Sequence, residues 1–133
     1  MKNKITIKNY DQTQDADAMF ELMRLEGDWN DYCDEPNVVR YKVALKDSVT
    51  FVLYRDNTLC GFVRVRDDFG FGVYIHDLLV GKAYRGNGYG KKLIEFVADN
   101  FAGNTIYVMS DVDEYYRKQG YDKIEGRIII VRK

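Results

Sequence analysis

The sequence predicts a mixed α/β fold with an antiparallel meander near its centre. Short runs of β-branched and aromatic residues, separated by turn-forming residues, fill the middle of the chain. Other segments repeat apolar residues at helical spacing. A glycine-rich loop lies between a strand-like run and one of these helical segments. The expected order is β-α-α-β-β-β-α-β-α-β, and the length of 133 residues suits one domain over residues 1–133.

The first half of the chain is expected to open with a short strand around residues 5–7, where apolar and polar residues alternate. A helix over residues 15–26 follows, with Asp15 as its cap. A second helix is expected over residues 36–47, because Pro36 is favoured in a first turn. Turns at 56–57 and 67–70 then separate the strands of the meander, which are 50–54, 59–66 and 73–80.

The second half carries the glycine-rich loop, residues 85–90, and the helix that it opens. A Gly-Asn pair ends that helix, and a D-x-x-E pattern at residues 111–114 has the form of a helix-capping box. The remaining elements expected are helix 91–101, strand 106–109, a helix from residue 111 to 119 that stops at Gly120, and strand 128–131.

The composition excludes several classes of protein. Lys and Arg number 20 and Asp and Glu 21, a formal charge of −1, so no global charge favours nucleic acid or an anionic membrane. Cys33, Cys60 and a single His cannot form a Cys/His zinc site, and we expect no metal. We expect two free thiols in a reducing cytoplasm. The chain has no apolar signal-peptide core and no run long enough to span a membrane.

A glycine-rich turn between a strand and a helix can bind an anion, because the first amides of the helix lack internal partners and the helix dipole favours negative charge. Gly86, Gly88 and Gly90 would let a phosphate approach closely, and nearby basic residues add positive charge. The alternative is a tight turn without a ligand. The loop matches neither a Walker loop, which needs Ser or Thr where Lys92 stands, nor a Rossmann fingerprint, which needs Gly where Lys91 stands.

Two segments together resemble the GNAT N-acetyltransferase superfamily. Residues 77–93 resemble its motif A, with the R-x-x-G-x-G pattern at Arg85–Gly90, and Tyr115–Tyr121 resembles its F-Y-x-x-x-G-F segment. The resemblance covers nearly the whole chain. It implies a GNAT-like single domain: a mixed, mainly antiparallel twisted sheet with helices on both faces. It also implies that strands 73–80 and 105–109 splay apart to admit the pantetheine arm of acetyl-CoA.

The same resemblance implies how acetyl-CoA is bound. The backbone of Leu78, Leu79 and Val80 would pair with pantetheine like an added strand, and loop amides would hold the pyrophosphate. An amide near Val80 would also donate to the developing oxyanion. The cofactor-binding residues of the loop are then Arg85, Gly86, Asn87, Gly88, Tyr89, Gly90 and Lys91.

For catalysis, Tyr116 matches the tyrosine that serves as general acid in the family, and core packing is the alternative role. The candidate base is His76, since its ordinary pKa lies near neutrality. A purely structural histidine and a water relay are the alternatives, and Met109 stands near a second position where some relatives carry a carboxylate. Strict alternation places Tyr74 and His76 on one face and Asp77 on the other, unless a bulge intervenes.

The acceptor pocket in this family is lined by the segment after the first helix, which is acidic and aromatic here. Carboxylates and aromatic faces attract cationic amines. Trp29, Asp31, Tyr32 and Tyr74 are therefore the candidate substrate-binding residues, and a solvated acidic loop is the alternative reading.

The sequence thus predicts an acetyltransferase that moves an acetyl group from acetyl-CoA to a small cationic amine by direct attack. A protein lysine or an N-terminal amine is the alternative acceptor. A catalytically silent module that binds acetyl-CoA, as a sensor or for an assembly partner, is the alternative function, and a phosphate-binding regulatory domain is a more distant one. A homodimer stays open as the assembly.

Overall fold

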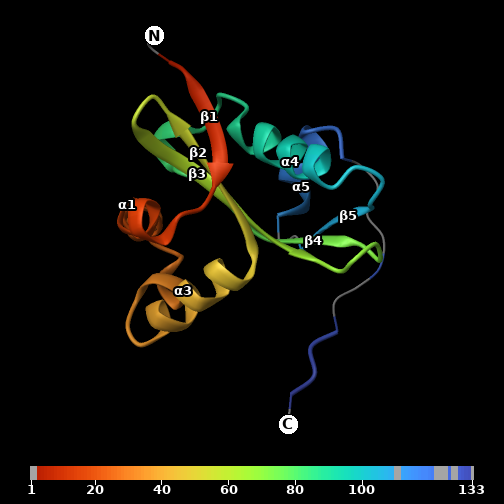
Figure 1. The fold of residues 1–133 in the computed structure, drawn as a ribbon, viewed down its shortest axis with the longest axis horizontal. Helices are drawn as coiled ribbons and strands as arrows, with labels where there is room; N and C mark the ends of the chain where they lie inside the picture. Colours follow the sequence, from red (N-terminus) through yellow and green to blue (C-terminus); the bar gives the residue numbers. More distant parts are fainter. Residues whose placement is uncertain (1–2, 110–111, 122–125, 127–128, 133) are drawn as a thin grey trace.

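The computed structural model describes residues 3–109, 112–121, 126 and 129–132. Five strands form one open sheet in the order β1-β2-β3-β4-β5 (Figure 1). Neighbouring strands are antiparallel, except that β4 and β5 run parallel. The strands are β1 (Ile5–Asn9), β2 (Val49–Arg55), β3 (Thr58–Asp67), β4 (Val73–Val80) and β5 (Ile106–Val108). The predicted mixed, mainly antiparallel α/β fold is confirmed.

Helices cover both faces of this sheet. Figure 1 shows α1 and α3 on one side, and α4 with α5 on the other. The helical segments are α1 (Gln12–Glu26), α2 (Asn30–Cys33), α3 (Asn37–Asp47), the 3₁₀ turn η1 (Lys82–Tyr84), α4 (Tyr89–Asn100) and α5 (Asp113–Lys118).

Two apolar clusters, one on each face, hold the layers together. Because successive strand residues point to opposite faces, Phe62 packs toward α1 and α3, whereas Val63 and Val65 pack toward α4. The α4 face receives Leu93 and Val97, both fully buried. The sheet is therefore buried on both faces near the point where β4 leads into α4.

Helix α1 begins earlier than the sequence predicted. The carboxylate of Asp11 caps it by accepting from the amides of Thr13 and Gln14 at 2.9 and 3.2 Å. Asp15, the expected cap, is buried inside the first turn and accepts from the Asp11 amide at 2.8 Å. The helix ends at Gly27, whose φ of 90° is the left-handed conformation that glycine adopts readily.

Strands β4 and β5 pair over only a few residues before they separate. The parallel register runs from Val73 opposite Ile106 to Ile75 opposite Val108, and the amide of Met109 donates to the Ile75 carbonyl at 3.0 Å. Residues 77–80 of β4 are not paired with β5. The predicted splayed strand pair is present.

One prediction near the C-terminus is wrong within the described residues. Ile129, Ile130 and Val131 lie outside any strand and are 78%, 67% and 86% exposed. β-Propensity forms a strand only where a neighbour supplies the hydrogen bonds, and none of the five strands pairs with this segment. Residue 128 lies outside the described residues.

The expected capping box at residues 111–114 lies only partly within the described part of the chain. Val112 is the N-cap of α5 and makes no side-chain cap hydrogen bond. Asp111, the other end of the predicted pattern, falls outside the described residues.

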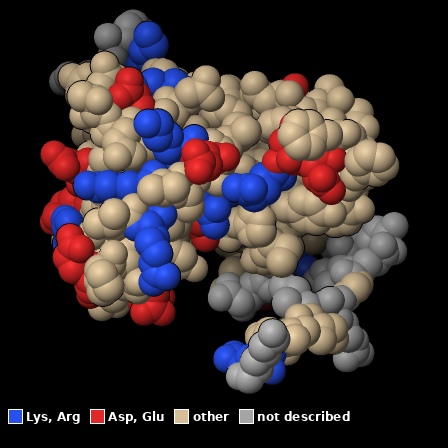
Figure 2. All heavy atoms as spheres, turned by 60° about the horizontal axis from the view of Figure 1, so that its bottom comes forward, with Lys and Arg blue, Asp and Glu red and all other residues tan. Residues whose placement is uncertain are grey.

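Charges of both signs intermingle on the face that Figure 2 shows, in keeping with a formal charge of −1. Cys33 and Cys60 are buried free thiols, as predicted. Among the described residues, no helix is long and apolar enough to cross a membrane.

Candidate active site

The glycine-rich loop turns β4 into α4 with an open space beside it. Gly86 and Gly88 adopt left-handed φ angles of 83° and 76°, and a Cβ at either position would meet nothing within 4 Å. The side-chain Nδ2 of Asn87 donates to the Tyr84 carbonyl at 2.9 Å and stabilises the loop from within. Gly88 caps α4, whose first amides face outward from the helix. The loop has the geometry of an anion site.

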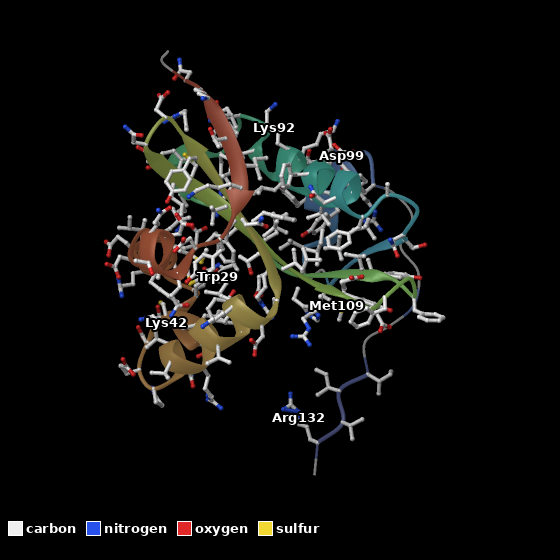
Figure 3. The ribbon with its side chains drawn as sticks, in the orientation of Figure 1. Trp29, Lys42, Lys92, Asp99, Met109 and Arg132 are labelled. Atoms are coloured by element: carbon white, nitrogen blue, oxygen red, sulfur yellow. The ribbon has the colours of Figure 1, made fainter. Side chains whose placement is uncertain are left out.

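The side chains flanking this loop take different roles. Tyr89 is buried in the cluster under α4, so only its backbone remains for a ligand. Lys91 and Lys92 are exposed in the first turn of α4, and Figure 3 shows Lys92 directed away from the sheet. Both ammonium groups add positive potential at the helix N-terminus.

Gly90 differs from Gly86 and Gly88, because the side chain of another residue fills the space where its Cβ would be. A Cβ there would overlap the hydroxyl of Tyr115 and lie 3.1 Å from the ring carbon that carries it. The hydroxyl of Tyr115 in α5 therefore sits against the first turn of α4. Burial, followed by Tyr121, raises the pKa of Tyr115, while Arg85 lowers it.

Arg85 is less free than the sequence suggested. Its Nε donates to the Val80 carbonyl at 3.0 Å, and its Nη2 donates to the Glu26 carboxylate. Half of the guanidinium side chain nevertheless remains exposed. Arg85 thus joins the end of α1, the end of β4 and the loop.

The unpaired edge of β4 leads directly into this loop. The side chain of Leu79 packs toward α1, and those of Leu78 and Val80 pack toward α4. The side chains are committed to the two cores, and backbone N–H and C=O groups remain at this edge for an extended ligand, apart from the Val80 carbonyl that accepts from Arg85.

A β-bulge in β4 changes the face on which the candidate base was expected. Arg64 lies opposite Asp77, and the next residue of β3, Val65, lies opposite Ile75, so His76 is the extra residue. The bulge places Asp77 on the same face as Tyr74, and His76 is exposed. Strict alternation across residues 74–77 is therefore wrong.

Asp77 is part of a buried polar network beneath this bulge. Its Oδ2 accepts from the Tyr41 hydroxyl at 2.7 Å and from Nε of Arg64 at 2.6 Å. Nη1 of Arg64 also donates to the Ser48 hydroxyl at 3.2 Å. The network fixes α3 and β3 to β4 through this ion-paired carboxylate.

The sequence analysis missed three members of this network, Tyr41, Arg64 and Ser48. The available signal was a pair of oppositely charged residues, Arg64 and Asp77, within strands that are otherwise apolar. Buried charges require partners, so such a pair predicts a contact across the sheet.

The network and the local burial also act on the neighbouring histidine. Burial and then Arg64 lower the pKa of His76, and Asp77 partly opposes them. The imidazole is therefore more readily neutral than in a free peptide, which is the state that a general base needs. Burial, followed by Asp77, raises the pKa of Tyr41, so its phenol stays protonated.

Tyr116, the candidate general acid, is half-buried against the cluster under α4. Its ring meets that of Tyr115 edge to face, with centroids 5.1 Å apart. The Tyr115 hydroxyl thus lies against the first turn of α4, while the Tyr116 ring packs on the cluster under that helix.

The aromatic residues after α1 form a chain that leads to the Asp77 network. Trp29 lies between α1 and α3 (Figure 3) and packs on Phe62 at a centroid distance of 5.8 Å. The Tyr32 ring lies 5.2 Å from that of Trp29 and 4.9 Å from that of Tyr41. Asp31 is exposed. Trp29 is thus mainly a packing residue, while Asp31 and Tyr32 remain accessible.

Tyr74 lies farther along the same face. It stacks on Tyr107 of β5 with centroids 5.0 Å apart and an interplanar angle of 16°. Tyr107 and Met109 are 47% and 40% exposed, so this end of the face presents aromatic and thioether groups to solvent. The structure therefore separates Tyr74 from Trp29 and Tyr32, which it groups around Tyr41.

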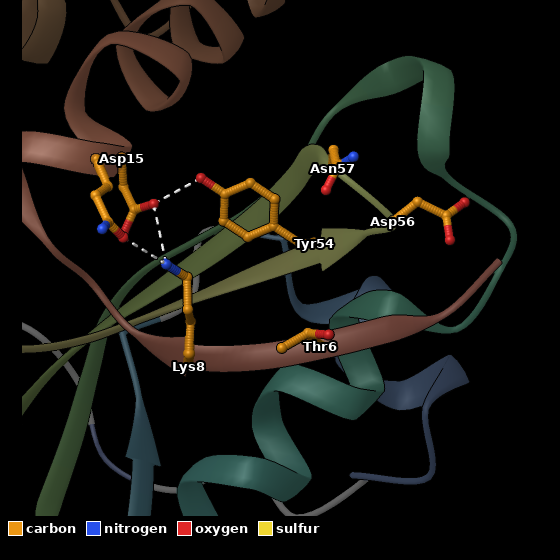
Figure 4. A pocket seen from close by; sticks show the side chains of 7 residues that line it. Thr6, Lys8, Asp15, Tyr54, Asp56 and Asn57 are labelled. Carbon is orange, nitrogen blue, oxygen red and sulfur yellow. Dashed lines mark hydrogen bonds and ion pairs between the residues drawn. The ribbon is translucent and has the colours of Figure 1, made fainter. Parts of the chain in front are cut away.

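A hollow lies at the other edge of the sheet, between β1, β2 and the start of α1 (Figure 4). It has a volume of about 320 Å³. Asp15 there accepts from the Tyr54 hydroxyl at 2.6 Å and lies 3.5 Å from Nζ of Lys8. Asp15 and Lys8 neutralise each other, and their contacts attach α1 to the sheet.

The acetyltransferase (GNAT) family model matches residues 16–121. The chain belongs to the GNAT acetyltransferase family. Histone acetyltransferase TAP1 of Glycine max is 38% identical over 69 residues, which are 48% of this chain and 30% of that protein. Probable acetyltransferase TAP2 of the same plant matches at the same identity over 28% of its length. The chain therefore spans less than a third of the length of these two relatives.

Solved structures share the GNAT fold over almost the whole chain. Aminoglycoside N-acetyltransferase AAC(6')-Iy in complex with CoA has a TM-score of 0.75 at 17% identity, covering 100% of this chain and 97% of that chain. Ribosomal-protein-alanine N-acetyltransferase from Brucella melitensis biovar Abortus 2308 has a TM-score of 0.72 at 19% identity, covering 98% and 100%. At these identities the likeness shows the fold alone.

Proposed function

We propose that this protein transfers the acetyl group of acetyl-CoA to a primary amine, by direct attack of the amine on the thioester in a ternary complex. One observation carries the proposal: the unpaired edge of β4 continues into a glycine-rich loop that opens α4. An extended amide-containing arm and a pyrophosphate are the two chemistries that such an edge and loop accept. Membership of the GNAT family supports the same ligand.

The residues present fit acetyl-CoA. The backbone of Leu78, Leu79 and Val80 pairs with the pantetheine arm, and the amides of residues 86–91 hold the pyrophosphate. The open space beside Gly86 and Gly88 leaves room for that group. A structural neighbour is described in complex with CoA. No group of three or more metal-ligating side chains occurs among the described residues, and the reaction as proposed uses no metal.

In the proposed reaction, the amine nitrogen forms a bond to the thioester carbonyl carbon and the carbon–sulfur bond breaks. A backbone amide near Val80 stabilises the oxyanion that develops in between. His76 accepts one proton from the bound ammonium, which leaves the nitrogen neutral for attack. Tyr116 gives its proton to the leaving sulfur, and the second proton that the nitrogen loses returns to Tyr116. The lowered pKa of His76 supports the first assignment.

The acceptor that we propose is a small cationic amine. Asp28, Asp31, Asp34 and Glu35 are exposed after α1, close in sequence to the aromatic rings of Trp29 and Tyr32. Their negative charge attracts a polyamine-like or aminoglycoside-like molecule. Two of the structural neighbours are described as aminoglycoside acetyltransferases.

Two alternatives follow from specific observations. A protein amine is favoured by relatives described as a histone acetyltransferase and a ribosomal-protein-alanine N-acetyltransferase. A catalytically silent module that binds acetyl-CoA is favoured by the half-buried position of Tyr116, because packing alone would account for this residue.

Two measurements distinguish these functions. Calorimetry with acetyl-CoA tests binding. Release of the free thiol is then followed with a polyamine, an aminoglycoside, a lysine-containing peptide and a peptide with a free N-terminus. We expect binding, and fastest release with the polyamine or aminoglycoside. Binding without release from any amine would identify a silent module, and absence of binding would overturn the proposal.

A further inference from the structure

Glu26 is a buried carboxylate that the proposed reaction does not use. It is the last residue of α1, with 9% of its surface exposed, and it accepts a hydrogen bond from Nη2 of Arg85. A carboxylate this buried requires a counter-charge, because an unpaired buried charge is strongly destabilising. Arg85 supplies that charge from the glycine-rich loop.

The contact with Glu26 fixes which edge of the Arg85 guanidinium is occupied. Nε donates to the Val80 carbonyl at 3.0 Å, and Nη2 donates to Glu26. Half of the side chain is exposed, and its other N–H groups remain for an anion beside the loop. A guanidinium held in this way is preorganised, so less rotamer entropy is lost when it meets a phosphate.

The surroundings make this anchor rigid. A Cβ at Gly81 would overlap the side chain of Leu22, so the last turns of α1 lie directly against the end of β4. The amide of Gly81 donates to the Cys60 carbonyl at 2.9 Å, which ties the same point to β3. Glu26 therefore binds Arg85 from the end of a helix that is packed firmly against the sheet.

We propose that Glu26 is a positioning residue, which orients the guanidinium of Arg85 at the end of β4 so that it binds the pyrophosphate of the cosubstrate. This inference rests on the proposed use of acetyl-CoA. Glu26 acts through Arg85 and has no contact of its own with the phosphate. Its loss weakens only ligands that carry the pyrophosphate.

The test compares two substitutions, Glu26→Gln and Glu26→Ala, with Glu21→Gln as the matched control. Glu21 lies on the same helix, but it is exposed and pairs only with Arg24 at the surface. Calorimetry gives the Kd for acetyl-CoA. Thiol-release kinetics with S-acetylpantetheine, which lacks the pyrophosphate, give a second readout. Denaturation of each variant reports its stability.

We expect Glu26→Ala to raise the Kd for acetyl-CoA about tenfold, the scale of one charge-assisted hydrogen bond. Glu26→Gln keeps an acceptor oxygen and should recover part of this loss, and Glu21→Gln should bind as wild type does. The kcat/KM for S-acetylpantetheine should be unchanged. In an Arg85→Ala background, Glu26→Ala should have no further effect on the Kd.

Several results would overturn the inference. An unchanged or tighter Kd in both Glu26 variants would show that the carboxylate is neutral to the phosphate or competes with it. An equal loss with acetyl-CoA and S-acetylpantetheine, or an additive loss in the Arg85→Ala background, would make Glu26 merely structural. If wild type itself fails to bind acetyl-CoA, the proposed function is wrong, which is a separate outcome.

Discussion

The hydroxyl of Tyr41 in α3 donates a 2.7 Å hydrogen bond to the carboxylate of Asp77, which is the first residue after the bulge in β4. The same carboxylate oxygen accepts from Arg64 on β3. The buried carboxylate of Asp77 thus connects a helix to two strands, next to the bulge residue His76, the candidate base. Substitution of Asp77 therefore tests a contribution to stability, separately from the proposed catalytic residues.

We expect Asp77→Asn to lower the free energy of unfolding by about 3 kcal/mol, because it leaves Arg64, whose side chain is only 16% exposed, without its counter-charge. Tyr41→Phe should cost about 1.5–3 kcal/mol, the scale of a hydrogen bond to a charged group. Asp99→Asn, at an exposed position of α4, should stay within about 0.5 kcal/mol of wild type. Urea denaturation measures all three. An Asp77→Asn variant as stable as wild type would mean that the ion pair contributes nothing.

The cofactor loop is tested by Gly88→Asp. Its side chain would project into the open space at the start of α4 and set a carboxylate against the pyrophosphate. Binding of acetyl-CoA should be abolished in calorimetry. The matched control is Gly103→Asp, at a glycine after α4 with a similar φ of 86° and no neighbour within 4 Å.

At both positions the backbone would hold the new aspartate in a left-handed conformation, so both variants should lose about 1 kcal/mol of stability. Only Gly88→Asp should lose binding. Equal affinity in the two variants would remove the loop from the phosphate site. Gly90→Asp is a less suitable probe, because its side chain would displace Tyr115.

The general acid is tested by Tyr116→Phe, with Tyr115→Phe beside it. Loss of the Tyr116 hydroxyl should reduce kcat about 100-fold or more, while the Kd for acetyl-CoA changes little. Tyr115→Phe removes the neighbouring hydroxyl, which lies against Gly90, and should leave kcat near that of wild type. Rates are compared under conditions where the chemical step is limiting. If Tyr115→Phe is the slower variant, the proton comes from Tyr115.

The pH dependence follows from the lowered pKa of His76. A base must be neutral, so the acidic limb of the kcat/KM profile should fall below the ordinary histidine pKa of about 6.5. Activity should therefore be level from about pH 7 upward, until another group titrates. His76→Gln should remove this limb and lower kcat by about 100-fold or more. A limb that persists unchanged in His76→Gln would assign the proton transfer to another group.

The same shift has a consequence for stability. A histidine whose pKa is lower in the folded than in the unfolded chain stabilises the fold above its unfolded pKa, and this contribution is lost as the pH falls through the folded value. The difference in Tm between wild type and His76→Gln should accordingly shift against wild type from pH 8 to pH 5. A difference that is constant over this range would contradict the environment described for His76.

Local patterns in the sequence predicted much of the framework. The meander, the helix after the glycine loop and the strand at 106–109 followed from local β-prone runs, turn residues and helical spacing, because each depends on neighbouring residues. The loop at Arg85–Gly90 was found from its own glycines. Contacts between distant segments were not predicted: no local pattern reports that Arg85 faces Glu26 or that Asp77 faces Tyr41.

The bulge at His76 shows why side-chain faces are harder to predict than strands. One extra residue in β4 reverses the alternation, and nothing in the sequence of residues 73–80 marks where the insertion occurs. The final apolar run illustrates the same dependence. Its composition favours a strand, but strand formation is decided by a partner elsewhere in the fold.

The short pairing of β4 with β5 has a consequence for handling the protein. Beyond Ile75, the backbone of β4 presents a row of N–H and C=O groups that no strand of the described sheet covers on that side. Such a border is a template on which a second chain can add, and folded proteins normally shield it. A ligand that lies along residues 77–80 would supply that shielding. Solutions of the protein should accordingly resist aggregation better, during concentration or storage, when the ligand is present.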